Sequence, residues 1–580
     1  MVMLGRLAAA FSRAADKVPA HVPDVVLGLN DPAPLGKAVP LALQQIALQS
    51  VYFVLPGVVA AAYGGGALEA TNYLCLSLLG LALFAVLSAL RRGPIGPGYP
   101  VVATPSAVLF GPLIFAASQG ATMGHAVALT ILTGLATALV APMMRRIVAL
   151  MPTEVTGVVV FMIGASLLPG MMSMLRLDPA AQGDAVPQVV VAFGAFVIMV
   201  VVAVLRWRFA PYAVLIGAAA GTVAAVMLGM VSPDARQTLV RAPWFALPAP
   251  PAAPDFGFPP ALAVSFLLSL VASLATAVGV FVAFQRATDG SWTRPDAGPI
   301  RRGILAQGIA LMLTGLAGGM GTAPSASCAA LSIATRTFAR RIALVGAAIL
   351  AALAVCPKAV ALIVLVPAPV QAAMLLYVAG FMMAQGCAMV VQRTLDTRRT
   401  IVAGLGLTAG LAVLAAPRFF AVALPALAAP LAMGALVAFL ANLVTLPLVK
   451  RIQSFRIPLG KGASDLIEDR AFAVGGAWGL RSETVRKVHH ALTEIGDLLA
   501  ARGLAEMTVT ATQQEETVVV TVAFAGPPLP LPARRPRAED IEAGGDALEA
   551  VSLWLALREA TRHAMRRTAE GQEVRLEFLD

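Results

Sequence analysis

Two apolar stretches of this chain carry small polar side chains on backbone that cannot form an unbroken helix. In residues 96–112, glycines and prolines surround Thr104 and Ser106, and in residues 315–336 they surround a longer group. That group consists of Thr322, Ser325 and Ser327, with Ala323 among them. Irregular backbone at membrane depth is tolerated only where protein or a polar cavity satisfies it. Two broken apolar segments in corresponding halves therefore predict the substrate site of a transporter built from repeats.

The chemistry of such a site follows from the ends of helices. A helix that starts at mid-membrane has unpaired N–H groups, and its dipole adds partial positive charge there. Two such ends that face each other would suit a carbonyl-bearing or anionic solute. Glutamine supplies a donor and an acceptor, as a flat heterocycle requires, and Gln44 and Gln45 lie in the first apolar span. Thr276 lies in the eighth span, and for any one of these residues hydrogen bonding between helices is the alternative interpretation.

Few ionisable side chains lie inside the apolar segments, where a charge is a functional hypothesis by default. Glu154 and Lys358 sit near span ends, and we expect them to extend to the membrane interface. No nucleophile–base pair or metal-ligand spacing is evident in the sequence. We therefore expect no enzyme activity, no catalytic residue, no metal and no cofactor.

The composition is that of a polytopic membrane protein. The 580 residues are 59% hydrophobic and 13% charged, and the mean hydropathy is +0.83. The net charge of +11 does not indicate a nucleic-acid partner, because many basic residues lie in short loops between apolar runs. The partners we expect are the lipid bilayer and a small-molecule substrate.

Fourteen apolar spans are predicted, which makes the membrane part all-α. Most approach the ~20 residues that a bilayer requires, and the third, ninth, tenth and eleventh are shorter or interrupted. The spans are 38–63, 70–90, 100–118, 124–144, 153–173, 187–205, 210–231, 258–285, 303–319, 322–338, 341–356, 368–390, 400–416 and 423–448.

The loops alternate in charge along the whole chain, which sets the orientation. With the N-terminus inside, the basic pairs Arg91/Arg92 and Arg145/Arg146 fall on the inner face, and the outer loops hold few basic residues. We therefore expect a multi-pass protein of the inner (plasma) membrane with both termini in the cytoplasm. The Pro/Ala-rich segment 232–257 divides seven spans from seven.

Three regions follow from these patterns. Residues 1–37 are predicted to be a cytoplasmic N-terminal segment, and 38–452 a transporter domain. Residues 463–580 are charged and predict a soluble cytoplasmic α/β domain. Its expected elements are helices at 482–502 and 546–567 and strands at 506–512, 516–524 and 574–578.

The membrane part resembles the nucleobase/ascorbate transporter family, which includes bacterial uracil and xanthine permeases. The segment Gly28-Leu-Asn-Asp-Pro-Ala-Pro-Leu-Gly36, which leads to Gln44 and Gln45, is similar to that family's approach to its first span. The regions 98–112, 259–286 and 315–336 resemble its third, eighth and tenth spans, and the likeness covers roughly 25–452. The resemblance implies two inverted repeats of seven spans, a core domain that moves against a gate domain, and a homodimer.

The resemblance also shows two departures. Family members carry a base-binding carboxylate in the eighth span, and that position holds Thr276 here. A second acid of the tenth-span signature falls near Ser327, and Gln45 replaces the usual histidine. An intramembrane carboxylate is the natural proton carrier, so the coupling ion, a proton or sodium, is left open. The solute is then a purine or pyrimidine, or a small organic anion.

The C-terminal region resembles the ATPase fold of histidine kinases and anti-sigma-factor kinases. Leu498 stands where the magnesium-binding Asn would be, and Phe524 replaces the adenine-binding Asp. Trp554 lies where a glycine-rich helix would meet phosphate. We expect a degenerate domain without ATPase activity.

Three hypotheses remain. The first is a secondary transporter of uracil, xanthine or purine-like solutes that works by alternating access. The second is an anion transporter of the sulfate-permease type, which shares the fold. The third is a membrane sensor derived from a transporter that signals through 463–580.

Overall fold

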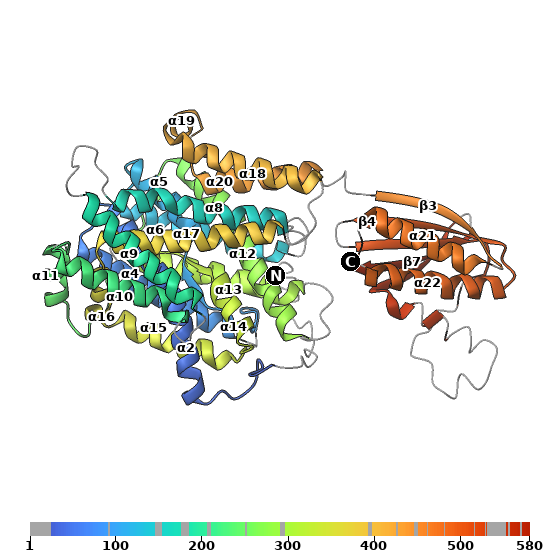
Figure 1. Cartoon of the computed structure of the whole chain (residues 1–580), viewed down its shortest axis with the longest axis horizontal. Helices are drawn as coiled ribbons and strands as arrows, with labels where there is room; N and C mark the ends of the chain where they lie inside the picture. The colour runs from blue at the N-terminus through green and yellow to red at the C-terminus, as the bar shows by residue number, and fades with distance from the viewer. Residues whose placement is uncertain are drawn as a thin grey trace, which may run out of the picture. The chain divides into compact units, whose positions relative to one another are not determined.

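The structure is a computed structural model that describes residues 25–579 apart from several segments (Figure 1). The segments outside the described residues are 91–92, 145–152, 176–184, 206–209, 232, 250–251, 290–295, 392–396, 425–426, 446–450, 461, 479, 481, 515–516, 528, 530–550, 552, 555–556 and 569–570. Contacts divide the chain into a membrane unit, Met1–Asn442, and a C-terminal unit, Leu443–Asp580, which are described separately.

The membrane unit is built from helices and two three-residue strands. Its first half contains α2 (Leu35–Gln49), η1 (Ser50–Tyr52), α3 (Val54–Ala62), α4 (Ala67–Ala89), β1 (Ala103–Pro105), α5 (Ala107–Ser118), α6 (Met123–Val140), η2 (Ala141–Met143), α8 (Thr153–Met174), α9 (Ala185–Val204), η4 (Ala210–Tyr212) and α10 (Ala213–Met227). Its second half contains α11 (Pro233–Arg241), α12 (Pro260–Thr288), α13 (Ala297–Ala317), β2 (Thr322–Pro324), α14 (Ala326–Ala334), α15 (Arg340–Ala354), α16 (Pro357–Val364), α17 (Ala368–Val390), α18 (Thr397–Ala415), α19 (Pro417–Ala423) and α20 (Pro430–Thr445).

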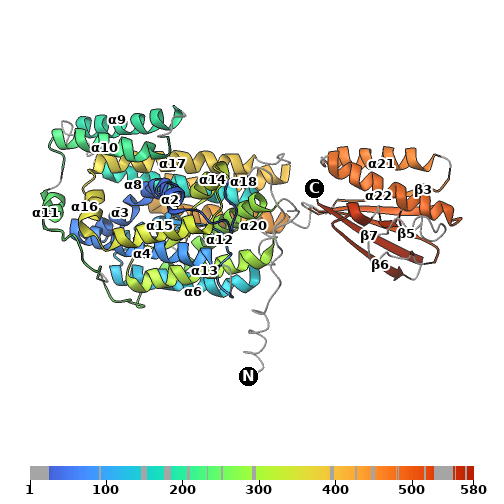
Figure 2. The ribbon, with the colours of Figure 1, turned by 90° about the horizontal axis from the view of Figure 1, so that it is seen from below.

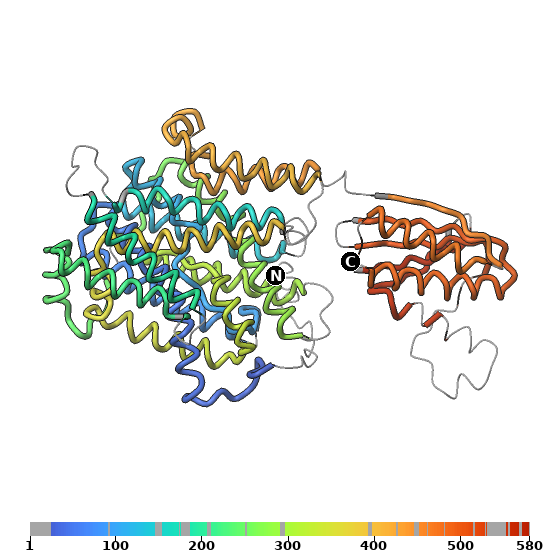
Figure 3. The backbone as a smooth tube through the Cα atoms, viewed as in Figure 1, coloured from blue at the N-terminus to red at the C-terminus, as the bar shows by residue number. Residues whose placement is uncertain are grey.

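The predicted helical membrane fold is confirmed, with interruptions at the third and tenth segments. Among the described residues, nine helices are long and apolar enough to cross a membrane, and α15 with α16, bent by 87°, makes a tenth. Each predicted segment contains a helix, but α5, α10, α14 and α20 are shorter. The count of fourteen spans therefore stays a prediction. The backbone reverses direction at the short helix α19, which lies between α18 and α20 in the chain (Figure 3).

Glycines set the closest helix contacts of the membrane unit. Helix α8 packs along α17, and α6 along α13 (Figures 1 and 2). A Cβ on Gly386 of α17 would lie 2.4 Å from the backbone nitrogen of Phe161 on α8. A Cβ on Gly308 of α13 would lie 2.5 Å from the backbone nitrogen of Ala138 on α6. Small residues allow helix backbones to approach in this way inside a bilayer.

The side chain of Glu154 is where the structure contradicts the sequence-based expectation. It is only 2% exposed, and Arg399 Nε on α18 lies 2.8 Å from Glu154 Oε1 on α8. The prediction that Glu154 extends to the interface is wrong, because an ionic partner on a neighbouring helix compensates the buried charge. Lys358 donates to the carbonyl of Val240 and lies over the ring of Trp244, in a polar setting typical of an interface.

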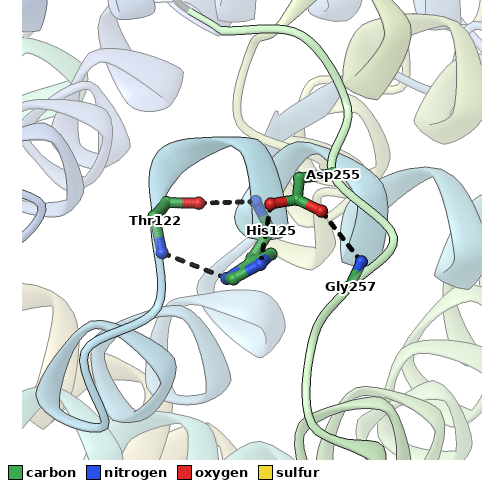
Figure 4. Close-up of polar contacts among 4 residues, drawn as sticks. All are labelled: Thr122, His125, Asp255 and Gly257. Atoms are coloured by element: carbon green, nitrogen blue, oxygen red, sulfur yellow. Dashed lines mark hydrogen bonds and ion pairs between the residues drawn. The ribbon is translucent and has the colours of Figure 1, made fainter.

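A histidine ties the segment between the two halves to the start of α6 (Figure 4). Thr122 Oγ1 accepts from the backbone of His125, and His125 Nδ1 accepts from the backbone of Thr122, at 3.3 and 3.2 Å. Because Nδ1 is an acceptor, Nε2 is the nitrogen that donates to Asp255 Oδ2, at 3.0 Å. The histidine thus completes a reciprocal helix cap and holds Asp255 at the same time.

We expect the His125–Asp255 contact to be weakly coupled. The Asp255 side chain is more than half exposed, so a double-mutant cycle of His125→Ala and Asp255→Ala should give a coupling free energy below about 1 kcal/mol. Unfolding of the purified variants, followed by intrinsic fluorescence, measures it. His125→Ala should cost more than Asp255→Ala, because it also removes part of the helix cap. The opposite order would contradict the assigned role of Nδ1.

The C-terminal unit is a five-stranded antiparallel sheet of order β3-β4-β5-β7-β6, with α21 and α22 on one face (Figure 2). Its elements are β3 (Arg451–Pro458), α21 (Ala463–Trp478), α22 (Ser482–Ala501), β4 (Glu506–Gln514), β5 (Thr517–Phe524), β6 (Arg562–Thr568) and β7 (Gly571–Leu579). Alternate residues of β5, from Val518 to Phe524, are buried in an apolar core beneath the helices.

Two features of this unit differ from the sequence-based predictions. The predicted helix at 546–567 is wrong from Arg562 onward, where β6 pairs with β7, and part of it lies outside the described residues. The sheet also begins earlier than 463, because β3 pairs with β4 along its whole length. Leu498 and Phe524 lie in the apolar core. The likeness to an ATPase fold stays a prediction.

Candidate functional site

The two interrupted segments meet in the middle of the membrane unit. Strands β1 and β2 pair in antiparallel register, with Thr104 opposite Ala323 and Pro105 opposite Thr322. Outside the strands, Ser106 donates its N–H to Gly321 O at 2.8 Å, and Ser325 donates its N–H to Val102 O at 3.0 Å. We call this β1–β2 pair with Ser106 and Ser325 the crossing. It satisfies backbone groups that two interrupted helices would otherwise leave unpaired.

A helix begins on each side of the crossing. Ser106 caps α5, where its Oγ accepts from Leu109 N at 3.3 Å, and Ser325 caps α14, where its Oγ accepts from Cys328 N at 3.3 Å. Because β1 and β2 are antiparallel, α5 and α14 leave the crossing in opposite directions with both N-termini at its centre. The predicted arrangement of two broken spans whose helix starts face each other is confirmed.

Two glutamines of α2 contact the interrupted segments, Gln49 at the crossing and Gln45 farther along α14. Gln49 Nε2 donates to Ala103 O of β1 at 3.0 Å, and Gln45 Nε2 donates to Ser332 Oγ of α14 at 3.0 Å. Both side chains are buried, whereas Gln44 is half-buried and takes part in neither contact. The structure therefore brings Gln45 and Gln49 into the site, and it does not bring Gln44.

The remaining predicted residues lie in or beside the crossing. Thr104, Ala323, Ser327 and Thr322 are buried, and the Tyr52 hydroxyl of η1 is a hydrogen-bond partner of Ser327. Thr276 is half-buried on α12, which packs against β2 and α14, and its Oγ1 donates to Ala272 O of its own helix at 3.0 Å. The structure thus groups Thr104, Thr322, Ala323 and Ser327 around one centre, and it places Thr276 on a helix that packs against that centre.

Several buried polar atoms on the elements that form the crossing or pack against it have no hydrogen-bond partner among the described residues. They are the Oε1 atoms of Gln45, Gln49 and Gln307 and the Oγ1 atom of Thr322. Gln307 of α13 is fixed by its amide, which donates to Ser273 Oγ of α12 at 2.8 Å. An unsatisfied buried polar atom costs about 1–3 kcal/mol, so such a concentration indicates a place where a polar ligand binds.

Sequence reasoning identifies Gln49 as an uncharged residue inside the first span but does not include it in the site, and it misses Tyr52 and Ser332. Gln45 and Gln49 are four residues apart, so they share one face of a helix, and this spacing could have added Gln49 to the predicted site. No local signal could have paired Gln45 with Ser332, because 287 positions separate them in the chain.

Comparison with known proteins gives a consistent result. A family model described as the permease family matches residues 36–419. The uric acid permease PucK of Bacillus subtilis (strain 168) is 28% identical over 393 residues, which are 66% of this chain and 88% of that protein. The uric acid permease PucJ of the same organism is 29% identical over 398 residues, which are 66% of this chain and 86% of that protein. The nucleobase transporter PlUacP of Paenibacillus larvae is 25% identical over 395 residues, which are 66% of this chain and 88% of that protein.

Solved structures share the fold at low sequence identity. Murine Slc26a9, an anion transporter in the inward-facing state, gives a TM-score of 0.53 at 12% identity and covers 78% of this chain and 77% of that one. The transmembrane domain of the cyanobacterial bicarbonate transporter BicA gives a TM-score of 0.50 at 15% identity, and the match covers 72% of this chain and 100% of that one. At these identities the likeness concerns the fold alone.

Proposed function

This chain belongs to the nucleobase/ascorbate transporter family of permeases, and from that premise we propose that it is a membrane transporter of purine-type nucleobases rather than an enzyme. The observation that carries the proposal is the crossing, where two helix starts meet beside buried glutamine and threonine oxygens without partners among the described residues. Relatives named as uric acid permeases and a nucleobase transporter support the same substrate class.

The chemistry of the crossing suits an oxopurine. Its ring N–H groups need acceptors, which Gln45 and Gln49 offer through Oε1. Its carbonyl oxygens need donors, which the Thr322 hydroxyl and the helix starts of α5 and α14 offer. Thr104, Ser106, Ser325, Ser327, Ala323 and Thr276 shape the rest of the proposed site.

Transport by alternating access follows if the crossing moves with one domain past the other. We infer a protein of the plasma membrane with both termini in the cytoplasm, which the alternation of basic loops supports. The family resemblance further suggests a homodimer. The soluble C-terminal unit then serves in regulation or partner docking.

Counterflow in proteoliposomes tests the proposal. We expect radiolabelled uric acid to enter vesicles preloaded with unlabelled uric acid, and xanthine and uracil to compete with it for one site. Vesicles without protein and vesicles preloaded with a neutral sugar are the controls. If small carboxylates or sulfonates drive counterflow while no nucleobase does, the nucleobase assignment is wrong.

A further inference from the structure

The buried polar atoms at the crossing that lack partners among the described residues are of two chemical kinds. Gln45 Oε1 and Gln49 Oε1 can only accept, whereas the Thr322 hydroxyl can also donate, and the Thr322 side chain is 0% exposed. The amide of Gln49 donates to β1, which holds its oxygen beside the crossing, and the amide of Gln45 donates to Ser332, which holds its oxygen beside α14. The ligand that satisfies both kinds carries N–H donors on one part and an electron-rich acceptor on another.

The helix starts add a positive potential to this set. Both α5 and α14 begin at the crossing, and each places the positive end of its dipole there. In water such an end has a small effect, but it is screened far less where the surroundings are buried. Thr322 lies between the two starts, three residues before the cap of α14. A negative charge is therefore favoured at the centre.

No acidic side chain opposes that potential within the described part of the membrane unit. Glu154 is its one buried carboxylate, and its charge is compensated by Arg399 on α18. The positions where the family resemblance would place acids hold Thr276 and Ser327. Neither hydroxyl can carry a negative charge or pick up a proton at physiological pH.

The titratable groups around the crossing lead to the same conclusion. On the elements packed against it, the buried ones are Tyr52, Tyr73, Cys75 and Cys328, whose side chains are neutral in their ordinary state. The charged ones stand toward helix ends and are Lys37, Glu69, Arg286, Arg301 and Arg302. His125, at the start of α6, is already bonded to Asp255.

We propose that this carrier takes its substrate as a monoanion and moves it without a coupled proton. The inference rests on the proposed function and gives the charge state of its substrate. Uric acid, which is mainly a monoanion at neutral pH, fits the site better than the neutral uracil or hypoxanthine. Each transport step then moves one net negative charge across the membrane, so the membrane potential drives it.

The test uses the full chain in proteoliposomes with potassium gradients and valinomycin, at equal pH on both sides. Accumulation of radiolabelled uric acid should rise at least about fivefold with an inside-positive potential over zero potential, and a pH gradient alone should have no effect. Acceleration by external acid without a response to the potential would overturn the inference. If uric acid counterflow persists while the potential has no effect, the proposed function stands and only the inference about charge fails. If counterflow is absent as well, both the proposed function and the inference fail.

A charge-specific pair of variants sharpens the test. Thr276→Glu introduces a carboxylate that can carry a proton, and it should make uric acid transport respond to external acid. Thr276→Gln has nearly the same size and no charge, and the rate that it retains should not respond to external acid. Thr288→Glu is a matched control, since Thr288 also donates to the carbonyl four residues back but lies at the end of α12. An equal response to external acid in Thr276→Glu and Thr276→Gln would contradict the inference.

Discussion

Substitution of Gly386 by valine should prevent the membrane unit from reaching its folded state in useful amounts. A Cβ at this position would lie 2.4 Å from Phe161 N and 2.7 Å from Gly157 O, which are backbone atoms of α8. Backbone cannot rotate away as a long side chain can, so α8 and α17 would have to separate along their contact. We expect a loss of about 3 kcal/mol or more, at the upper end of overpacking effects.

Thermal unfolding and size-exclusion chromatography of the detergent-solubilised protein measure this effect. Gly380→Val is the matched control, because Gly380 lies on the same helix and no described atom would stand within 4 Å of a Cβ added there. Both variants lose the same glycine and gain the same β-branched side chain, so intrinsic helix preference cancels. A Gly386→Val protein as stable as Gly380→Val would show that the α8–α17 contact is looser than the structure has it.

Those two glycines also show where sequence reasoning ends. Gly380 and Gly386 occur six positions apart in one apolar helix, and nothing local distinguishes them. Only the partner helix decides which one a side chain would clash with. By contrast, the breaks at β1 and β2 are predictable, because glycine and proline interrupt a helix through their own backbone chemistry.

The candidate site is likewise predictable where it depends on local backbone chemistry, and not where it depends on how helices pack. The residues of the two broken segments, such as Thr104 and Thr322, can be identified because they stand next to the interruption that makes the site. The choice between Gln44 and Gln45 depends on the rotation of α2 about its axis, which its neighbours set. The sequence predicts both, and it is Gln45 whose side chain contacts α14, through Ser332.

The C-terminal unit shows tertiary structure overriding a local preference. The sequence of β6, Arg-His-Ala-Met-Arg-Arg-Thr, is rich in residues that favour helices, and by itself it predicts one. In the structure it is the edge strand of a sheet, paired with β7 from Arg562 opposite Glu577 to Thr568 opposite Gly571. Cross-strand pairing with β7 therefore outweighs a propensity of a few tenths of a kcal/mol per residue.

Replacement of Thr322 by valine should leave stability almost unchanged and reduce transport strongly. Valine keeps the shape of threonine, and the Thr322 hydroxyl has no hydrogen-bond partner among the described residues, so its removal leaves no protein group unpaired. If the hydroxyl donates to a bound anion, its loss should weaken binding by about 1.5–3 kcal/mol, which corresponds to about 10- to 150-fold. Uric acid binding by the purified protein and its thermal unfolding are measured side by side.

Thr314→Val provides the comparison that separates a binding role from a structural one. Thr314 is as deeply buried, but its Oγ1 donates to Ala310 O of its own helix at 2.6 Å, so its hydroxyl is already used. We expect this variant to bind uric acid normally. Removal of a hydroxyl that stabilises the protein lowers the melting temperature. Removal of a hydroxyl that binds the substrate lowers the affinity for uric acid and leaves the melting temperature unchanged. Thr322→Val should fall in the second class, and normal affinity in that variant would place the substrate away from the crossing.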